Sequence, residues 1–341
     1  MMQENFSLKK FNTFGIDVSS RYFSTFSNLD ELQGLLEFHG SLNNTQQSSP
    51  LILGGGSNIL FTKNINGLVL KNEIYGIKRV REDDEHVFIK AGAGVKWHDL
   101  VIYCINNNLA GMENLSLIPG NTGASPMQNI GAYGIEVKDI FFELEALYIA
   151  EKKVAVFNVE DCEFGYRESV FKRKLNGQFV ILNVSFRLDK HPLFNTSYGA
   201  IEAELEQMGV KELSIQAVSQ AVINIRRSKL PNPEVIGNAG SFFKNPEISV
   251  PQFQILKNNA PGIIGYELPN GNIKLAAGWL IEQCGWKGFR KGDVGCHAKQ
   301  ALVLVNYGNA NGADIYSLST DIINSVHQKF GVLLEREVNI M

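Results

Sequence analysis

The chain has 341 residues, of which 44% are hydrophobic and 20% are charged, a composition typical of a globular protein with two or three domains. The net charge of −3 at pH 7 and the pI near 6.1 argue against a nucleic-acid or membrane-surface binder. The sequence contains neither an apolar run of about 20 residues, which a membrane span needs, nor an N-terminal signal-peptide pattern. The four cysteines form no CxxC pair and are interpreted as reduced thiols, so we expect a cytoplasmic protein.

The first third of the chain predicts two helices, a polar loop and an apolar strand. Asn28 is placed to cap a helix whose apolar face carries Leu29, Leu32, Leu35 and Leu36. Residues 41–50 are polar and loop-like, and the apolar run Leu51–Leu53 follows. A second helix is expected to turn Leu100, Val101, Cys104 and Ile105 inward.

The rest of the chain changes from strands to longer helices. Three β-like runs span residues 144–149, 154–159 and 179–188. The polar segment at residues 189–192 is the best candidate for a domain boundary. Helices are expected at 215–225, 275–284 and 313–330, and a closing strand at 332–340. The pattern indicates an α+β protein with a mixed-β first half and a βαβ-like second half.

Two segments rich in small residues suggest a large cofactor that contains a diphosphate. The first is Gly54-Gly55-Gly56-Ser57-Asn58, and the second runs from residue 117 to 134 with four glycines and two prolines. Glycine lets backbone N–H groups approach an anion or a flat ring closely. The first segment is not a GxGxxG fingerprint, because Ile59 stands where the third glycine would be. Gly92-Ala93-Gly94 also fails, with Trp97 in that place, and no GxxxxGK[ST] motif occurs.

Polar residues in tight or apolar contexts form four further candidate sites, each with a structural alternative. Arg167 lies between β-like runs and could simply form an ion pair at a sheet edge. Ser241 lies in GNAGSFFKNP, where a tight turn could serve only to bury two phenylalanines. Glu335 and Glu337 share one face of a strand by alternation, and that face could be merely solvated. The cations at 226–229 end a helix, where capping is the simpler interpretation.

Metal chemistry is not expected. The cysteines, Cys104, Cys162, Cys284 and Cys296, form no CxxC pair, and the six histidines have no metal-ligand spacing.

Taken in order along the chain, these motifs resemble those of the UDP-N-acetylenolpyruvoylglucosamine reductase (MurB) family. The long strings QNIGAYG and GNAGSFFKNP are specific to it, and the resemblance covers nearly the whole chain. A tyrosine loop at residues 194–199 makes the chain similar to the longer, type I form. The resemblance implies a vanillyl-alcohol-oxidase (PCMH)-type FAD-binding domain at 1–188, with subdomains of about 1–70 and 71–188. A smaller α+β substrate-binding domain at 189–341 would follow.

The resemblance also implies a cofactor and a reaction. FAD, bound non-covalently, would reduce UDP-N-acetylglucosamine enolpyruvate at the expense of NADPH, in a monomeric enzyme. The residues that match the FAD-binding positions are Gly54, Gly56, Ser57, Asn58, Pro119, Gly120, Gly123, Ser125, Gln128, Gly131, Ala132 and Tyr133. Neither loop carries the His or Cys that links flavin in covalent relatives.

Arg167, Ser241 and Glu337 match the family's catalytic positions, with Ser241 as proton donor and the other two beside the substrate carboxylate. Glu335 is expected to be dispensable. The residues that match substrate contacts are Tyr198, Lys229, Asn245, Tyr266 and Gln300. One departure is Arg336, which stands where a proline often precedes the second acid.

Two alternatives stay open at this point. The first is an FAD oxidase of the same superfamily that uses oxygen, and it would lack the serine of SFFKNP and turn over without NADPH. The second is a non-catalytic flavin or nucleotide-sugar binding protein, which predicts loss of Arg167, Ser241 or Glu337, although all three are present.

Overall fold

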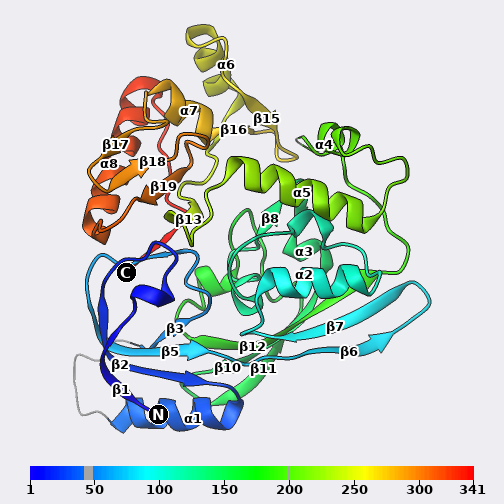
Figure 1. Cartoon of the computed structure of the whole chain (residues 1–341), viewed down its shortest axis with the longest axis vertical. Coiled ribbons are helices and arrows are strands. Elements are labelled where there is room, and N and C mark those ends of the chain that lie inside the picture. The colour runs from blue at the N-terminus through cyan, green and yellow to red at the C-terminus, as the bar shows by residue number, and fades with distance from the viewer. Residues whose placement is uncertain (42–48, 199) are drawn as a thin grey trace. The chain divides into compact units, whose positions relative to one another are not determined.

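The computed structural model describes residues 1–41, 49–198 and 200–341 (Figure 1). Two compact units are distinguished. The first comprises Met1–Phe6, Ser20–Gly55 and Ile65–Ser228, and the second comprises Ser7–Ser19, Gly56–Asn64 and Lys229–Met341. Most of the polar loop expected at 41–50, and Gly199 of the tyrosine loop, lie outside the described residues.

The change from the first to the second compact unit at residues 228 and 229 comes later than the expected domain boundary at 188 and 189. Packing explains the difference. Helices α4 (Ile201–Gln207) and α5 (Ile215–Lys229) share an apolar cluster with Tyr133, which belongs to the first unit. The assignment of FAD to residues 1–188 and of the substrate to residues 189–341 stays a prediction.

In the first unit, one sheet is mainly parallel and is covered by the N-terminal helix. Its order is β1 (Gln3–Ser7), β2 (Ser19–Phe26), β5 (Ile65–Asn72) and β3 (Leu51–Leu53). Helix α1 (Leu29–Ser41) lies beside it (Figure 1), and Leu32 and Leu36 pack into the same core as Leu68. The predicted cap is confirmed, because Asn28 Oδ1 accepts the Glu31 N–H at 2.9 Å.

The second sheet of this unit is antiparallel. Its order is β11 (Lys153–Phe157), β10 (Phe141–Tyr148), β12 (Phe179–Asp189), β7 (His86–Gly92) and β6 (Ile77–Glu82). Helix α2 (Trp97–Asn106) lies between this sheet and α5 (Figure 1). Short elements complete the unit: β8 (Gly131–Ala132), β9 (Ile135–Glu136), α3 (Val137–Ile140), and 3-10 turns η2 (Glu113–Leu115), η3 (Thr122–Ala124) and η4 (Val170–Lys172).

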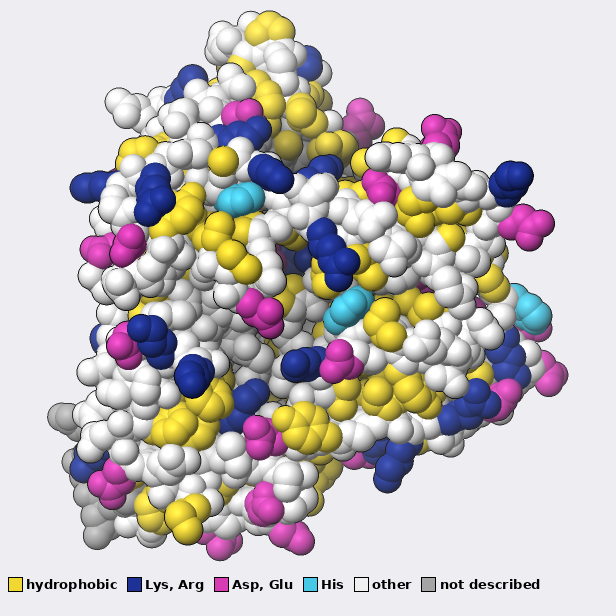
Figure 2. Space-filling view, viewed as in Figure 1, with side chains coloured by type: hydrophobic (Ala, Val, Ile, Leu, Met, Phe, Trp, Pro, Cys, Tyr) yellow, Lys and Arg dark blue, Asp and Glu magenta, His cyan; other side chains and the backbone are white. Residues whose placement is uncertain are grey.

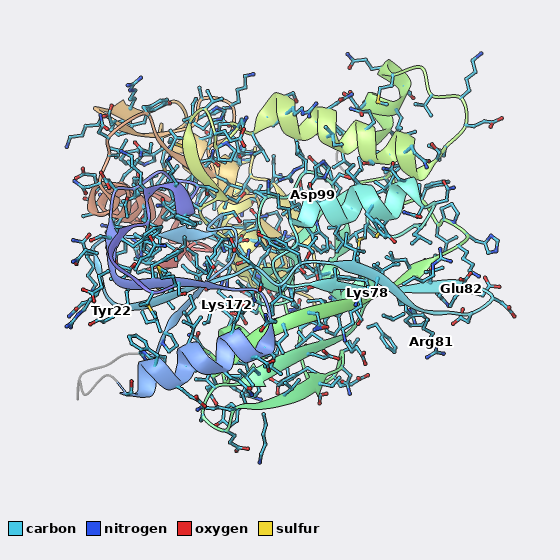
Figure 3. All side chains as sticks on the ribbon, turned by 60° about the horizontal axis from the view of Figure 1, so that its bottom comes forward. Tyr22, Lys78, Arg81, Glu82, Asp99 and Lys172 are labelled. Atoms are coloured by element: carbon cyan, nitrogen blue, oxygen red, sulfur yellow. The ribbon has the colours of Figure 1, made fainter. Side chains whose placement is uncertain are left out.

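The edge strand β6 carries charge along most of its length. Figure 3 shows Lys78, Arg81 and Glu82 on this strand. Arg81 lies over the Phe88 ring at 4.8 Å, and Glu82 accepts from Lys190 at 2.7 Å. In Figure 2, basic side chains lie near acidic ones over this hairpin. Charged edges discourage pairing with another chain, so we interpret this surface as a protected sheet edge.

The two larger sheets of the second unit consist of antiparallel pairs, so the expectation of a βαβ-like second half is wrong. One sheet has the order β13 (Gly237–Ser241), β19 (Val303–Asn306), β18 (Val294–Cys296) and β17 (Arg290–Lys291). Another has the order β14 (Glu247–Ile248), β16 (Ile273–Leu275) and β15 (Gly265–Glu267). The helices of this unit are η1 (Lys9–Phe11), α6 (Val250–Asn259), α7 (Ala277–Gln283) and α8 (Gly312–Phe330). These strands run antiparallel because hairpins and short turns connect β17, β18 and β19. Among the described residues, no helix is long and apolar enough to cross a membrane.

The closing strand is much shorter than the predicted 332–340. It is confined to β20 (Asn339–Ile340), which pairs in parallel with β4 (Ile59–Leu60). Before it, the bridge between Phe243 and Arg336 is the one that the described part of the chain shows for the tail. The tail forms no continuous strand because its pairing partner changes. Arg336 pairs with Phe243, whereas Asn339 and Ile340 pair with β4. The alternation is confirmed for Leu334 and Val338, which are buried, and for Glu335, which is exposed, whereas Glu337 and Ile340 are both partly exposed.

Candidate active site

The two glycine segments meet inside the first unit. A Cβ atom at Gly55 would lie 2.8 Å from Gly120 Cα and 2.9 Å from Asn121 Oδ1. Only glycine permits this approach of two backbones. The first segment also links the units, since Gly54 and Gly55 belong to the first unit and Gly56 to Asn58 to the second.

The second glycine segment is anchored to the end of β7 and the turn after it. Thr122 N donates to Val95 O at 2.8 Å, Gly123 N donates to Ala93 O at 3.0 Å, and Asn121 Nδ2 donates to Gly94 O at 3.0 Å. A Cβ atom at Gly123 would lie 2.5 Å from Ala93 Cβ. The loop is therefore held by its backbone, and Ser125 supports it from within by donating to Thr122 O at 2.7 Å.

Replacing Gly123 with alanine should weaken this anchorage. We expect loss of bound flavin and a lower melting temperature, because overpacking of this kind costs about 1–3 kcal/mol. Flavin absorbance after gel filtration and a thermal melt measure the two effects. Gly34→Ala is the control, since Gly34 lies in α1 with open space around its Cα. A Gly123→Ala protein that retains flavin and stability as the control does would contradict this expectation.

Two lysines that the sequence analysis missed lie beside the glycine segments. Lys71 Nζ donates to Gly54 O at 2.6 Å. Burial lowers the pKa of Lys71, Glu73 opposes that shift, and the nearby charge of Lys96 lowers the pKa further. Lys96 itself pairs with Asn121 in a β-bridge. A signal for Lys71 was present in the sequence, because it is a lone charge at the end of the apolar run Leu68–Leu70.

The start of the second glycine segment is fixed in a strained conformation. Leu117 has φ +58°, uncommon for a bulky side chain. Its N–H donates to His98 Nδ1 at 3.0 Å and its carbonyl accepts from Arg226 Nε at 3.3 Å. Burial lowers the pKa of His98, against an opposing effect of Asp99, which favours the neutral imidazole that can accept this bond. Asn129, Tyr133 and Arg167 also have positive φ, and such strain clusters at functional sites.

Arg167 is directed at the second glycine segment and is not a simple ion pair at a sheet edge. Its guanidinium donates to Gly131 O at 2.5 Å and to Asn129 O at 3.3 Å, and it lies 3.8 Å from Glu136 Oε1. A Cβ atom at Gly131 would lie 2.8 Å from Arg167 Nη1. The glycine predicted to contact cofactor therefore also makes room for the predicted catalytic cation.

Asn129, which the sequence analysis did not single out, connects the surrounding segments. It is fully buried, and its Nδ2 donates both to Glu136 Oε2 and to Gly165 O at 3.0 Å. Its Oδ1 accepts the Lys138 N–H at 3.0 Å. This network fixes the loop that carries Arg167 against the second glycine segment.

In the second unit, Ser241 and the tail come together. Ser241 is the last residue of β13, and Glu337 N donates to Phe242 O at 2.8 Å. Asn58 Nδ2 donates to Glu337 O at 3.3 Å, and Asn339 N donates to Asn58 O at 3.2 Å. Phe242 and Phe243 are buried, as the structural alternative for this motif expected. The segments that carry the predicted proton donor and the predicted acid are thus joined through their backbones, although they are distant in sequence.

The predicted substrate contacts divide into a group around α7 and separate exposed residues. Asn245 Oδ1 accepts the Ala277 N–H at 3.0 Å, and Gln300 Oε1 lies 3.4 Å from the position of a Cβ at Gly278. Both side chains therefore lie at the first turn of α7. Tyr266 on β15 is 52% exposed, Tyr198 is 48% exposed, and Lys229 is exposed at the end of α5.

The remaining predicted cofactor contacts lie along the same two segments. Pro119 is exposed, and a group of residues is partly exposed: Gly54, Ser57, Gly120, Gln128, Ala132 and Tyr133. Gly56 is buried with φ +64°, and Phe11 O fills the space where its Cβ would lie. A side chain at residue 56 would therefore disturb the turn itself.

Comparison with known proteins gives consistent matches over the whole chain. One family model, described as the C-terminal domain of UDP-N-acetylenolpyruvoylglucosamine reductase, matches residues 232–341, and another, described as an FAD binding domain, matches residues 41–155. A UDP-N-acetylenolpyruvoylglucosamine reductase from Amoebophilus asiaticus is 51% identical over 340 residues, which cover 100% of this chain and 99% of that protein. One from Flavobacterium johnsoniae is 45% identical over 341 residues, with 100% and 99% covered.

A solved structure has the same fold. The UDP-N-acetylenolpyruvylglucosamine reductase of Thermus caldophilus gives a TM-score of 0.63 at 21% identity, covering 100% of this chain and 98% of that chain. The α+β class with an FAD-binding domain, expected from the sequence, is confirmed.

Proposed function

Because the chain belongs to the UDP-N-acetylenolpyruvoylglucosamine reductase family, we propose that Arg167, Ser241 and Glu337 carry its chemistry. The reaction is the reduction of UDP-N-acetylglucosamine enolpyruvate to UDP-N-acetylmuramate in peptidoglycan precursor synthesis, with FAD as cofactor and NADPH as reductant. The observation that carries the proposal is the hydrogen bond from Glu337 N to Phe242 O, which brings the backbone of residue 337 to the residue that follows Ser241.

The two glycine segments suit FAD. They approach each other where a Cβ atom would not fit, and Lys71 and Lys96 place positive charge beside them, as an anionic diphosphate requires. When bound, FAD supplies hydride transfer between NADPH and the vinyl CH₂ of the substrate. We assign the cofactor contacts to the residues predicted from sequence along the two segments.

Ser241 is proposed to give its proton to the substrate. Hydride addition at the vinyl CH₂ leaves a carbanion at the neighbouring carbon, stabilised as an enolate through the carboxylate. A serine hydroxyl is a weak acid, but an enolate carbon is basic enough to accept its proton. The position of Ser241 at the end of β13 holds its side chain on a rigid element.

Arg167 and Glu337 are proposed to stabilise the charge that develops on the substrate carboxylate. The cation balances this charge directly, and a protonated Glu337 can donate a hydrogen bond to it. Preorganised groups of this kind are effective because they need no reorganisation during the reaction. The bonds from Arg167 to Gly131 and Asn129 supply that preorganisation.

The other proposals concern binding and location. Asn245 and Gln300, which lie at the first turn of α7, are assigned to the nucleotide-sugar, as are Lys229, Tyr198 and Tyr266. We assign FAD to residues 1–188 and the substrate to 189–341. We also propose that the protein is a cytoplasmic monomer with non-covalent FAD.

Arg167→Lys tests the proposed role of the cation. Lysine keeps the charge but cannot reproduce the planar fork that reaches two carbonyls. We expect flavin reduction by NADPH to be retained and substrate-dependent flavin reoxidation to slow by about 10²-fold. Rapid-mixing absorbance measures the two steps separately. Arg187→Lys, at an exposed position of β12, is the control. Equal loss in both steps would mean that Arg167 only supports the fold.

A further inference from the structure

The tail that carries Glu337 has little regular structure to hold it. Gly331 ends α8 with φ +65°, and β20 does not begin until Asn339. Between them, the bridge of Phe243 with Arg336 is the β-pairing that the described residues show. Glu337 is therefore held by contacts around this bridge and by the hydrogen bond from Asn58 Nδ2 to its carbonyl.

The tail also carries two glutamates on the same face. Glu335 and Glu337 are two residues apart, so alternation places both on one face. A slip of the tail by two residues would leave each side chain on its own face and bring Glu335 to the place of Glu337. Backbone pairing with Phe242 and Lys244 does not distinguish these two registers.

The contacts of Lys244 distinguish the two registers of the tail. Its backbone N–H donates to Glu335 O at 2.9 Å, and its ammonium donates to Glu335 Oε1 at 2.7 Å. The Lys244 side chain is 9% exposed and that of Glu335 is 69% exposed. A largely buried ammonium needs a charged or hydrogen-bonding partner, so the register that gives it Glu335 is favoured.

Arg336 fixes the tail from the other side. Its Nε donates to Ser319 Oγ at 2.7 Å and its Nη2 donates to Thr320 Oγ1 at 2.6 Å. The guanidinium also lies over the ring of Tyr316 at 4.3 Å. These three residues lie on one face of α8 by helical spacing. A slip by two residues would remove the arginine from all three contacts.

We infer that Lys244, Glu335 and Arg336 are positioning residues that set the register of the tail and so deliver Glu337, and not Glu335, to Ser241. The inference rests on the proposed role of Glu337. It replaces the expectation that Glu335 is dispensable, because the sequence did not show that Lys244 is its partner.

Glu335→Ala and Arg336→Ala test the inference in two backgrounds, the natural sequence and Glu337→Ala. In the natural background we expect each variant to slow substrate-dependent flavin reoxidation by about 10- to 100-fold, since a misplacement of about 1 Å can cost that much. Flavin reduction by NADPH should be unchanged. In the Glu337→Ala background neither variant should slow reoxidation further, because both act through Glu337.

A matched control is Arg290→Ala. Arg290 also lies over a tyrosine ring, that of Tyr307 at 4.1 Å, and donates to a backbone carbonyl in the same unit. It should leave both steps unchanged. Glu335→Gln keeps the size of the side chain and replaces Glu335→Ala if that variant does not fold, as judged by a thermal melt.

The outcomes separate the inference from the proposed function. If Glu337→Ala slows reoxidation while Glu335→Ala and Arg336→Ala do not, the positioning role is wrong and the role of Glu337 stands. Equal slowing in both backgrounds would also overturn the positioning role. If Glu337→Ala itself reoxidises at the natural rate, the proposed role of Glu337 is wrong and the inference fails with it.

Discussion

Ser241→Ala is expected to slow reoxidation of the reduced flavin by substrate by about 10²- to 10⁴-fold, the usual contribution of a general acid. Reduction of the flavin by NADPH should proceed at nearly the natural rate. The reason is that the hydroxyl acts on the substrate carbon and takes no part in the first step. Rapid-mixing absorbance at the flavin band, with each step started separately, measures both rates.

Ser249→Ala is the control for this experiment. Ser249 caps α6 in the same unit through its bond with Gln252 N, so its loss should cost about 1 kcal/mol of stability without affecting either step. If Ser241→Ala slows both steps equally, Ser241 has a structural role only, in the turn that buries Phe242 and Phe243.

Glu337→Ala should slow reoxidation by about 10²- to 10³-fold, as expected when one preorganised group beside a developing charge is removed. Glu337→Gln should be slowed less, because the amide keeps a hydrogen-bond donor for the substrate carboxylate. The backbone bond from residue 337 to Phe242 O does not depend on the side chain, so the tail should keep its place in both variants. Single-turnover reoxidation, with thermal melts to confirm folding, measures the effect. A glutamine variant slower than the alanine variant would contradict the donor role.

The sequence predicted those features that depend on local pattern. The Asn28 cap, the inner face of α1 and the burial of Leu334 and Val338 follow from spacing and side-chain type. The two glycine segments were recognised because their composition is unusual. That they meet at Gly55 and Gly120 could be expected from a shared ligand, but the contact itself is a property of the fold.

What the sequence did not predict depends on contacts between distant residues. The predicted closing strand was too long, because the alternation of apolar and polar residues does not show where the partner strand ends. Lys244 in the SFFKNP motif gave no sign that it would meet Glu335, because the two are joined only when the tail folds back. The change between the compact units at 228 and 229 reflects packing of α5 on the first unit, whereas the composition changes earlier, at 189–192.

The family resemblance contributed what local pattern could not, namely the roles of Arg167, Ser241 and Glu337. The structure supplies a physical setting for each of them. Arg167 is bonded to the second glycine segment, and Ser241 lies next to the tail. Lys71 and Asn129 are residues that neither spacing nor resemblance identified, although both contact these segments directly.

The central claim is that the bound flavin carries reducing equivalents from NADPH to the enolpyruvyl substrate. It is tested most directly under nitrogen, by adding one equivalent of NADPH to the yellow protein and then UDP-N-acetylglucosamine enolpyruvate. We predict that the flavin band bleaches with NADPH and returns on addition of about one equivalent of substrate, with UDP-N-acetylmuramate as the product. A band that stays bleached until oxygen is admitted would contradict the account and indicate an oxidase.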